Sequence, residues 1–429
     1  MQRADADAQC GRDRRDLHQP GRGRGSAGRF LRDDRVEQGL PGTEGSGMNA
    51  PLQALNEMQR LTSPFPESIA IKDWKGAGKK VIGWVNPYVP EEIIYAAGML
   101  PFQISGNNEP VQMQGAEAYI LSNSCSYIRS CWQLQLDRQY SFLDGLVSSS
   151  FCDQDKRLYS VWEYYKKLPF MEIIYAPRKR EEAAVQLYLA DIEDFRDHLS
   201  QFGYRRIPQR DLADAIRIYN RGRELMHQLY ELRKRDRPPV TGAEALEVSK
   251  AAARLPRDQF NALMEQLLDE IERSGREIKK SRRLMVIGND VHNATQIAAL
   301  ETLDAVVVVD EMNCGIRYAW GQVDTQLPPM EALARYYVMG RPVDMHNWNS
   351  DGRLEFIGEM AEQYKVDGII SEIVRFCTYN GWDKFDLKKQ MEARGIPILD
   401  IDLEYGHPAG AQVKIRAEAF MEMLESRAS

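Results

Sequence analysis

The chain has 429 residues, a formal net charge of −7, and 43% hydrophobic and 28% charged residues. A chain of this length exceeds the size at which one hydrophobic core keeps growing, so two or three domains are expected. Lys and Arg are interspersed with Asp and Glu, which indicates no nucleic-acid partner. No apolar run is long enough for a membrane span, so we expect a cytoplasmic protein without membrane contact. Its six cysteines should then be thiols or metal ligands.

The first 47 residues differ in composition from the rest. They contain nine Arg and nine Gly but no Lys, Ile, Tyr or Trp. Such a segment cannot bury enough apolar area to offset the entropy of ordering, so residues 1–47 are expected to be disordered. An alternative interpretation is that they form a non-native extension and that Met48 is the native start.

Residues 48–180 have the pattern of an α/β domain with an N-terminal helix, which we expect at 52–61. A strand at 80–85 leads to a helix that opens at Pro90 with two acidic residues, as the helix dipole favours. Further strands are expected at 118–121, 144–148 and 171–175. Strands that alternate with helices are typical of a parallel sheet.

Residues 181–280 carry apolar side chains at helical spacing and no strand signal, so they are interpreted as a helical segment. Residues 281–429 return to the first pattern and predict a second α/β domain that closes with a helix at 411–424. Its strands are expected at 283–288, 305–310, 367–371 and 396–401. The predicted fold class is therefore α/β, with two Rossmann- or flavodoxin-like parallel-sheet domains joined by a helical segment.

Three cysteines each follow a run that reads as a buried strand: Cys125, Cys152 and Cys377. Since ligands collect at the carboxyl ends of the strands in an open α/β sheet, the three thiols are expected to converge. A single cysteine is more often a packing residue than a ligand. Three at equivalent positions favour a metal centre.

The cysteine spacing argues against two common kinds of metal site. Structural zinc sites use close Cys-x-x-Cys pairs, and ferredoxin-type domains use a close run of cysteines; neither occurs here. Cys131 is expected inside a helix as a packing residue. Cys314 follows another predicted strand and is a reserve ligand.

Polar residues also gather where the strand at 80–85 ends. Asn86, Tyr88 and Glu92 can bind a substrate carbonyl or supply a proton, and helix capping is the alternative. His407 is a fourth candidate proton donor. The basic groups at 178–180 and 279–283 are either solvated faces or contacts for the phosphates of a nucleotide-like carrier. No Gly-rich phosphate loop is present, so the chain is not expected to hydrolyse ATP.

Several stretches, taken in chain order, resemble the 2-hydroxyacyl-CoA dehydratase / benzoyl-CoA reductase core-subunit family. They are residues 83–101, Ser124-Cys-Ser-Tyr-Ile-Arg129, Ser150-Phe-Cys-Asp153, residues 310–320 and Gly395-Ile-Pro-Ile-Leu-Asp400. The resemblance covers the chain from about residue 50 to the C-terminus. The pattern at 144–159 and the Arg-Tyr-x-Trp at 317–320 look most like the smaller core subunit (C-type, gamma) of ATP-dependent benzoyl-CoA reductase.

The resemblance implies a cofactor and a set of partners. The family carries a [4Fe–4S] cluster on three cysteines that match Cys125, Cys152 and Cys377, with the fourth iron left for a water, hydroxide or substrate oxygen. It implies a second related core subunit, ATP-hydrolysing activator subunits, a ferredoxin-type electron donor and an aromatic acyl-CoA substrate.

The resemblance leaves three activities open. In the reductases, electrons enter the ring of benzoyl-CoA and give a cyclohexadiene-carboxyl-CoA. In the radical 2-hydroxyacyl-CoA dehydratases, one electron is recycled and water leaves. In a third interpretation, this chain only relays electrons, or is structural, beside a partner that binds the thioester.

Overall fold

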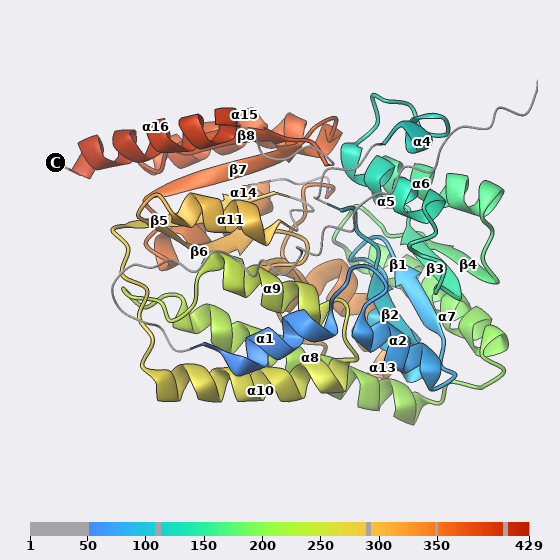
Figure 1. Ribbon diagram of the computed structural model, residues 1–429. Helices are drawn as coiled ribbons and strands as arrows, with labels where there is room; N and C mark the ends of the chain where they lie inside the picture. Colours follow the sequence, from blue (N-terminus) through green and yellow to red (C-terminus); the bar gives the residue numbers. More distant parts are fainter. Residues whose placement is uncertain (1–50, 108–112, 289–292, 348–350, 406–410, 429) are drawn as a thin grey trace, which may run out of the picture. The chain divides into compact units, whose positions relative to one another are not determined.

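The computed structural model describes residues 51–107, 113–288, 293–347, 351–405 and 411–428 (Figure 1). Residues 1–47 and His407 lie outside these ranges. The described chain contains two four-stranded sheets in which all strands are parallel, and helices cover both faces of each sheet. This arrangement confirms the expected α/β class with two flavodoxin- or Rossmann-like sheets.

The first sheet has the strand order β2-β1-β3-β4. On β1, Ile82 and Trp84 face the core formed with α3 and α7, whereas Val81, and Val85 just after the strand, face the core formed with α5 and α6. This alternation follows from the two-residue period of a strand, and both faces are apolar because both are covered. The elements are β1 (Val81–Trp84), β2 (Leu100–Gln103), β3 (Gly145–Ser149), β4 (Phe170–Ile174), α2 (Ile69–Gly76), α3 (Glu91–Ala96), α4 (Gln114–Glu117), α5 (Ser126–Leu136), α6 (Asp153–Tyr165) and α7 (Glu182–Phe202).

The second sheet has the order β6-β5-β7-β8. Met285 and Ile287 of β5 face the larger of its two cores, which includes α8 and α10, and Leu284 and Val286 face α11 and α16. The elements are β5 (Arg282–Ile287), β6 (Ala305–Glu311), β7 (Gly368–Val374), β8 (Ile398–Leu403), α11 (Ala294–Glu301), α12 (Ile316–Ala319), α13 (Pro329–Arg335), the π-helix η1 (Tyr336–Gly340), α14 (Asp351–Gln363), α15 (Thr378–Ala393) and α16 (Ala411–Ala428).

The two sheets share one topology. In each, the second strand in the sequence lies on one side of the first strand, and the third and fourth lie on the other. The strand order therefore reverses between β1 and β3 and again between β5 and β7. Crevices of this kind, outside the carboxyl ends of the strands, are where open α/β sheets bind ligands.

One predicted strand of the first sheet was wrong, and one strand of that sheet was missed. Residues 118–121 form a turn after α4 rather than a strand, so Cys125 does not follow a strand. A run of four apolar residues cannot distinguish a strand from a helix end. The strand β2 was missed because it contains Pro101, which lacks an N–H; the strand tolerates it because β2 is an edge strand.

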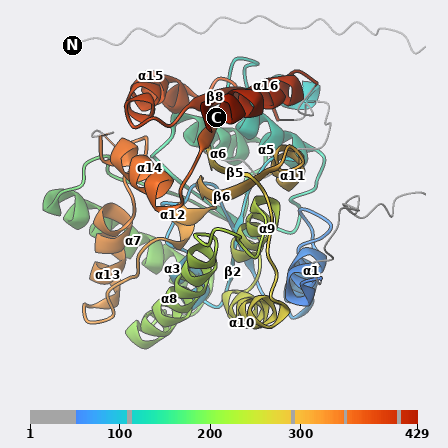
Figure 2. The same ribbon diagram turned by 90° about the vertical axis from the view of Figure 1, so that its left-hand side faces the viewer.

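Between β4 and β5 the described chain is helical. It contains α7, α8 (Gln209–Leu232), α9 (Gly242–Ala252) and α10 (Arg257–Ser274), and α1 (Gln53–Leu61) packs against α9 and α10 (Figure 2). The helix α9 lies within the helical segment expected at 181–280, and Thr241 and Glu244 form a capping box at its start, which is a sequence signal of a helix N-terminus. No helix in the described part of the chain is both long and apolar enough to cross a membrane.

The strand β7 buries an acidic residue. Glu372 is fully buried, and its Oε1 accepts a hydrogen bond from Nε2 of Gln296 at 2.8 Å. Its Oε2 has no hydrogen-bond partner in the described structure. Burial raises the pKa of this carboxyl group from 4.5 to about 8, because water no longer stabilises the charged form.

We predict a pH-dependent stability that depends on Glu372. A raised pKa in the folded state stabilises the protein fully below pH 4.5, and this contribution is lost as the pH rises through about 8. Near pH 5, the Glu372→Gln variant should melt at about the same temperature as the wild type. At pH 8.5 it should melt at a higher temperature, because its free energy of unfolding then exceeds that of the wild type by up to about 5 kcal/mol. The measurement is thermal unfolding followed by circular dichroism across this pH range.

The exposed Glu359 of α14 provides the matched control. Glu359→Gln should leave the pH profile of the melting temperature unchanged. A Glu372→Gln profile parallel to that of the wild type would contradict the prediction.

Candidate functional site

The three cysteines that the sequence singled out all occupy the same place relative to a helix. Cys125, Cys152 and Cys377 are the N-cap residues of α5, α6 and α15. Cys152 and Cys377 follow the third strand of their respective sheets, so the shared topology makes them equivalent. The positive end of a helix dipole favours the thiolate form of cysteine, which is the form that binds metals.

Hydrogen bonds tie Cys125 to its neighbours. Its backbone N–H donates to Oε1 of Gln154 at 3.4 Å, and Gln154 lies two residues after Cys152. The buried Arg129 of α5 donates to the carbonyl oxygen of Ser124 at 3.2 Å and pairs with Glu404 at 3.1 Å. These contacts hold the start of α5 between the start of α6 and the end of β8.

The segments that carry Cys152 and Cys377 are joined by Arg178. Its Nη2 atom donates to the carbonyl oxygen of Phe151 at 3.4 Å and to the hydroxyl oxygen of Tyr379 at 2.8 Å. Phe151 precedes Cys152, and Tyr379 lies two residues after Cys377. The first sheet and the second sheet therefore meet at their cysteine-bearing loops.

Burial dominates the electrostatics of Cys152. It raises the pKa of this thiol well above its usual value, and the Asp155 carboxylate and Cys125 raise it further, while backbone N–H groups of Gln154 and Asp155 lower it. Cys125 and Cys152 are thus close enough to affect each other's charge. A metal that binds here must displace the thiol proton, and its own positive charge is what makes that favourable.

The described residues contain no group of three or more His, Cys, Asp or Glu side chains arranged to hold a metal ion. A cluster makes a different demand, because each cysteine binds a different iron and the sulfurs need not converge on one point. Three thiols from three helix starts have the donor chemistry that iron–sulfur clusters use. Cys131 and Cys314 are both fully buried in hydrophobic cores, Cys131 with α5 and Cys314 beside β6.

Asn86 and Tyr88 lie beside Cys152. The Nδ2 of Asn86 donates to Oδ2 of Asp155 at 2.8 Å, and its Oδ1 accepts from the backbone N–H of Tyr88 at 3.1 Å. The ring of Tyr88 packs on Phe151 with a centroid distance of 3.9 Å. Burial raises the pKa of the Tyr88 hydroxyl, so it stays protonated. Both residues therefore order the loop after β1 against the start of α6.

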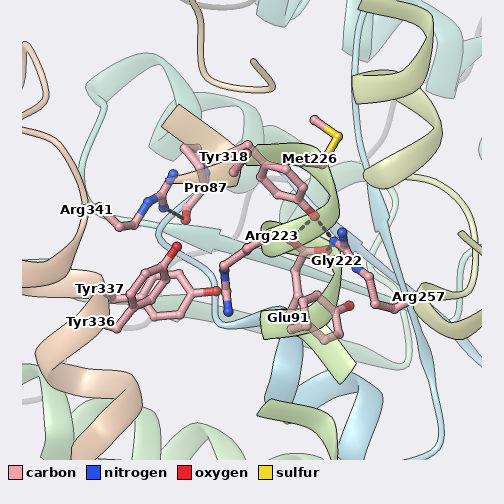
Figure 3. A pocket seen from close by; sticks show the side chains of 12 residues that line it. Pro87, Glu91, Gly222, Arg223, Met226, Arg257, Tyr318, Tyr336, Tyr337 and Arg341 are labelled. Atoms are coloured by element: carbon pink, nitrogen blue, oxygen red, sulfur yellow. Dashed lines mark hydrogen bonds and ion pairs between the residues drawn. The ribbon is translucent and has the colours of Figure 1, made fainter. Parts of the chain in front are cut away.

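Glu92 belongs to a different cluster, whose members Arg223 and Tyr337 are labelled in Figure 3. It is completely buried; Oε1 pairs with Arg223, and Oε2 accepts from the hydroxyl of Tyr337 at 2.9 Å. The neighbouring Glu91 accepts from the hydroxyl of Tyr318 at 2.7 Å, and burial raises its pKa to about 7. The cavity that these Tyr and Arg side chains line has a volume of about 10 Å³, room for about one water molecule.

The structure adds one residue that the sequence pattern did not indicate. His346 is 6% exposed and lies between two rings, with centroids 3.9 Å from Tyr379 and 4.7 Å from Phe151. Burial, aided by neighbouring guanidinium groups, lowers its pKa to about 3, so the ring is neutral. The sequence signal was only the pair Asp344 and His346, which is too common to single out.

The matching family model supports a common origin for this arrangement. It is described as 2-hydroxyglutaryl-CoA dehydratase, D-component, and it covers residues 86–424. The chain belongs to this family. The match begins at Asn86, so it includes the three cysteines and the loops that surround them.

Three curated relatives are about equally distant from this chain. The C-type subunit of the benzoyl-CoA reductase of Thauera aromatica is 24% identical over 357 residues, covering 82% of this chain and 92% of the relative. The (R)-phenyllactyl-CoA dehydratase beta subunit of Clostridium sporogenes is 24% identical, covering 84% and 96%. The beta subunit of the (R)-2-hydroxyglutaryl-CoA dehydratase of Acidaminococcus fermentans is also 24% identical, covering 87% and 100%. These relatives include both reductase and dehydratase subunits at the same identity, so the comparisons do not choose between the two activities.

We predict that Glu92 stabilises the fold rather than donating a proton. Glu92→Gln leaves the buried Arg223 without its carboxylate, and breaking one side of a buried ion pair costs about 3–5 kcal/mol. Urea unfolding should therefore shift to lower denaturant concentration in this variant. Glu193→Gln, at an exposed position of α7, is the control and should unfold like the wild type. Unchanged stability in Glu92→Gln, with activity lost, would return Glu92 to the candidate proton donors.

Proposed function

We propose that this chain is an iron–sulfur core subunit of an ATP-dependent benzoyl-CoA reductase. In this role it passes low-potential electrons towards the aromatic ring of benzoyl-CoA, and the product is a cyclohexadiene-carboxyl-CoA. The observation that carries the proposal is the placement of Cys125, Cys152 and Cys377 at three helix starts where the two sheets meet, in a chain of this family.

The three cysteines would hold a [4Fe–4S] cluster, which supplies a one-electron carrier. Features of this chain favour cluster binding at the three cysteines. Helix dipoles of α5, α6 and α15 favour thiolates at the three N-caps. Phe151, which precedes Cys152, and Tyr88 are both buried, and their rings pack on each other.

Cationic side chains around the cysteines support an anionic occupant. Arg178 bonds to the segments that carry Cys152 and Cys377. Arg129, Arg317 and Arg353 lie nearby as well, but each is already paired with carboxylates. Positive charge in a partly dry site stabilises thiolates and any electron added there. The same charges would also suit an acyl-CoA intermediate with negative charge on its thioester.

Partner proteins are part of the proposal. A chain with no phosphate loop must receive its electrons from another protein, which here means ATP-hydrolysing activator subunits fed by a ferredoxin-type donor. A second related core subunit would complete the catalytic unit. Exposed aromatic side chains, which are enriched at protein interfaces, lie on the helices that Cys377 and Cys152 begin: Trp382, Phe385, Tyr164 and Tyr165.

The alternative activity is that of a radical 2-hydroxyacyl-CoA dehydratase. Two of the three relatives are dehydratase beta subunits with the same 24% identity as the reductase subunit. In a further alternative, the partner core subunit binds the substrate and this chain only relays electrons. Where this chain does supply the proton, the donor is sought among Asn86, Tyr88 and His407, since the carboxylate of Glu92 is fully engaged.

We expect the complex, purified without oxygen, to contain iron and sulfide equivalent to one [4Fe–4S] cluster for each copy of this chain, in addition to those of its partners. Alanine at Cys125, Cys152 or Cys377 should remove most of this iron, because each loses one thiolate ligand. Cys131→Ala is the control and should keep the full amount. Unchanged iron in the three ligand variants would exclude this site.

The activity is tested with the same complex, ATP, a strong reductant and a choice of thioesters. ATP-dependent consumption of benzoyl-CoA is the expected result. Conversion of a 2-hydroxyacyl-CoA to its enoyl product, with only catalytic amounts of reductant, would assign the chain to the dehydratases instead.

A further inference from the structure

We propose that the outer face of α6 is the docking surface for an acidic electron-donating protein, the ATP-hydrolysing activator. This inference rests on the proposed function, because only a chain that carries a redox centre needs such a donor. It adds the place where the electrons enter. The α6 surface combines a groove, exposed aromatic rings and basic side chains: Tyr119, Tyr164, Tyr165, Arg157, Lys166 and Lys167.

The groove is the first observation. It has a volume of about 470 Å³, within the range of roughly 300–1,000 Å³ that binding pockets span. One wall is the turn at 119–121, and the other is one face of α6 between Asp153 and Val161. The groove is therefore large enough to receive side chains of a partner.

The groove lies beside the loops that carry two of the proposed cluster ligands. Asp153, on its α6 wall, directly follows Cys152. Leu121, on the opposite wall, is four residues before Cys125, whose backbone N–H donates to Gln154 of α6. Electron transfer slows steeply with distance, so a donor must dock close to the cluster. A protein seated in this groove is next to both cysteine-bearing loops.

Large apolar side chains beside the groove are exposed. Tyr164 is 81% exposed, Leu121 66% and Tyr165 52%. The ring of Tyr165 contacts the rings of Tyr119 and Tyr164, with centroid distances of 4.8 and 4.7 Å. A continuous exposed apolar patch marks an interaction site, and tyrosine is enriched at protein interfaces. The occupant of this surface is therefore a protein rather than solvent.

Charge decides the kind of protein. Arg157, Lys166 and Lys167 are exposed and form no ion pair within the described residues. On the same helix, the exposed Asp153 is neutralised by Lys156 at 2.7 Å, which leaves the carboxylate of Glu163 against three cations.

The α6 surface thus has an excess of positive charge, although the chain as a whole has a net charge of −7. Complementary charge steers association and fixes the orientation of the partner. An acidic protein surface is what this face attracts.

Docking serves a one-electron step. The reduced donor loses one electron, the cluster proposed on this chain gains it, and no bond forms or breaks in this chain. Hydrolysis of ATP by the donor drives the transfer. Electron-transfer contacts are small, so a groove with an aromatic and basic rim provides enough surface for one.

The test is the rate of ATP-dependent reduction of the cluster in the oxygen-free complex, measured at several salt concentrations. We expect the rate to fall as the salt concentration rises, because salt screens the attraction. Arg157→Glu should lower the rate at low salt about 10-fold or more, while reduction by a small-molecule reductant stays unchanged. Arg210→Glu is the control and should keep the wild-type rate, since α8 packs on the opposite face of the first sheet.

A zero-length carbodiimide cross-link identifies the occupant. This reagent joins amines to carboxylates, so Lys166 and Lys167 should link to acidic residues of the activator, and mass spectrometry locates the links. Absence of links to the activator, or a wild-type rate in Arg157→Glu, would overturn the proposal. A raised KM for the acyl-CoA with unchanged electron delivery would also overturn it, and would assign the groove to the nucleotide part of the substrate.

A second variant separates docking from folding. Tyr164→Ala removes an exposed ring, so it should slow electron delivery from the activator without lowering the melting temperature. Equal slowing with the activator and with the small-molecule reductant would contradict docking. A wild-type complex without cluster iron in this chain refutes the proposed function, whereas full iron content with wild-type rates in both variants refutes the docking surface alone.

Discussion

All strands of each sheet run parallel, so every loop that follows a strand leaves the sheet at the same edge. This constraint places residues of similar role together without any sequence proximity. Because both sheets have the same strand order, the loops after β3 and β7 are equivalent, and each ends in a cysteine that begins a helix. The site depends on these two edges meeting, which the bonds of Arg178 to Phe151 and Tyr379 accomplish.

Buried charge fixes the orientation of the elements around that edge. Glu311, at the end of β6, is fully buried and pairs with Arg317 at 2.9 Å and with Arg353 at 2.7 Å. Arg353 also pairs with Asp383 on α15, the helix that Cys377 begins. Each partner in such a network needs the others, because an unpaired buried charge is costly. The start of α15 is consequently tied to the second sheet by groups that have no part in its hydrophobic packing.

The sequence was informative about the site where chemistry and position coincide. The three cysteines were found because thiols after strand–helix patterns are uncommon, and the structure places all three at helix starts. The reasoning that placed Cys125 after a strand was nevertheless wrong. Cys125 follows a turn, and its backbone is held by a side chain of another element. Glu92 was mistaken for an available acid because its partners, Arg223 and Tyr337, are more than 100 residues away.

Element type and order could be read from the chain itself because apolar periodicity, helix capping and turn residues act over a few neighbouring residues. Seven of the eight expected strands match strands of the structure for that reason, and the missed strand β2 is a short edge strand whose proline obscured it. Only the tertiary structure decided which polar groups are satisfied and which are not. The partners of Glu92, the packing of His346 between Phe151 and Tyr379, and the junction at Arg178 all depend on contacts between segments far apart in the sequence. Local sequence patterns cannot predict these contacts, because they act over a few neighbouring residues and the contacts form only when distant segments pack together.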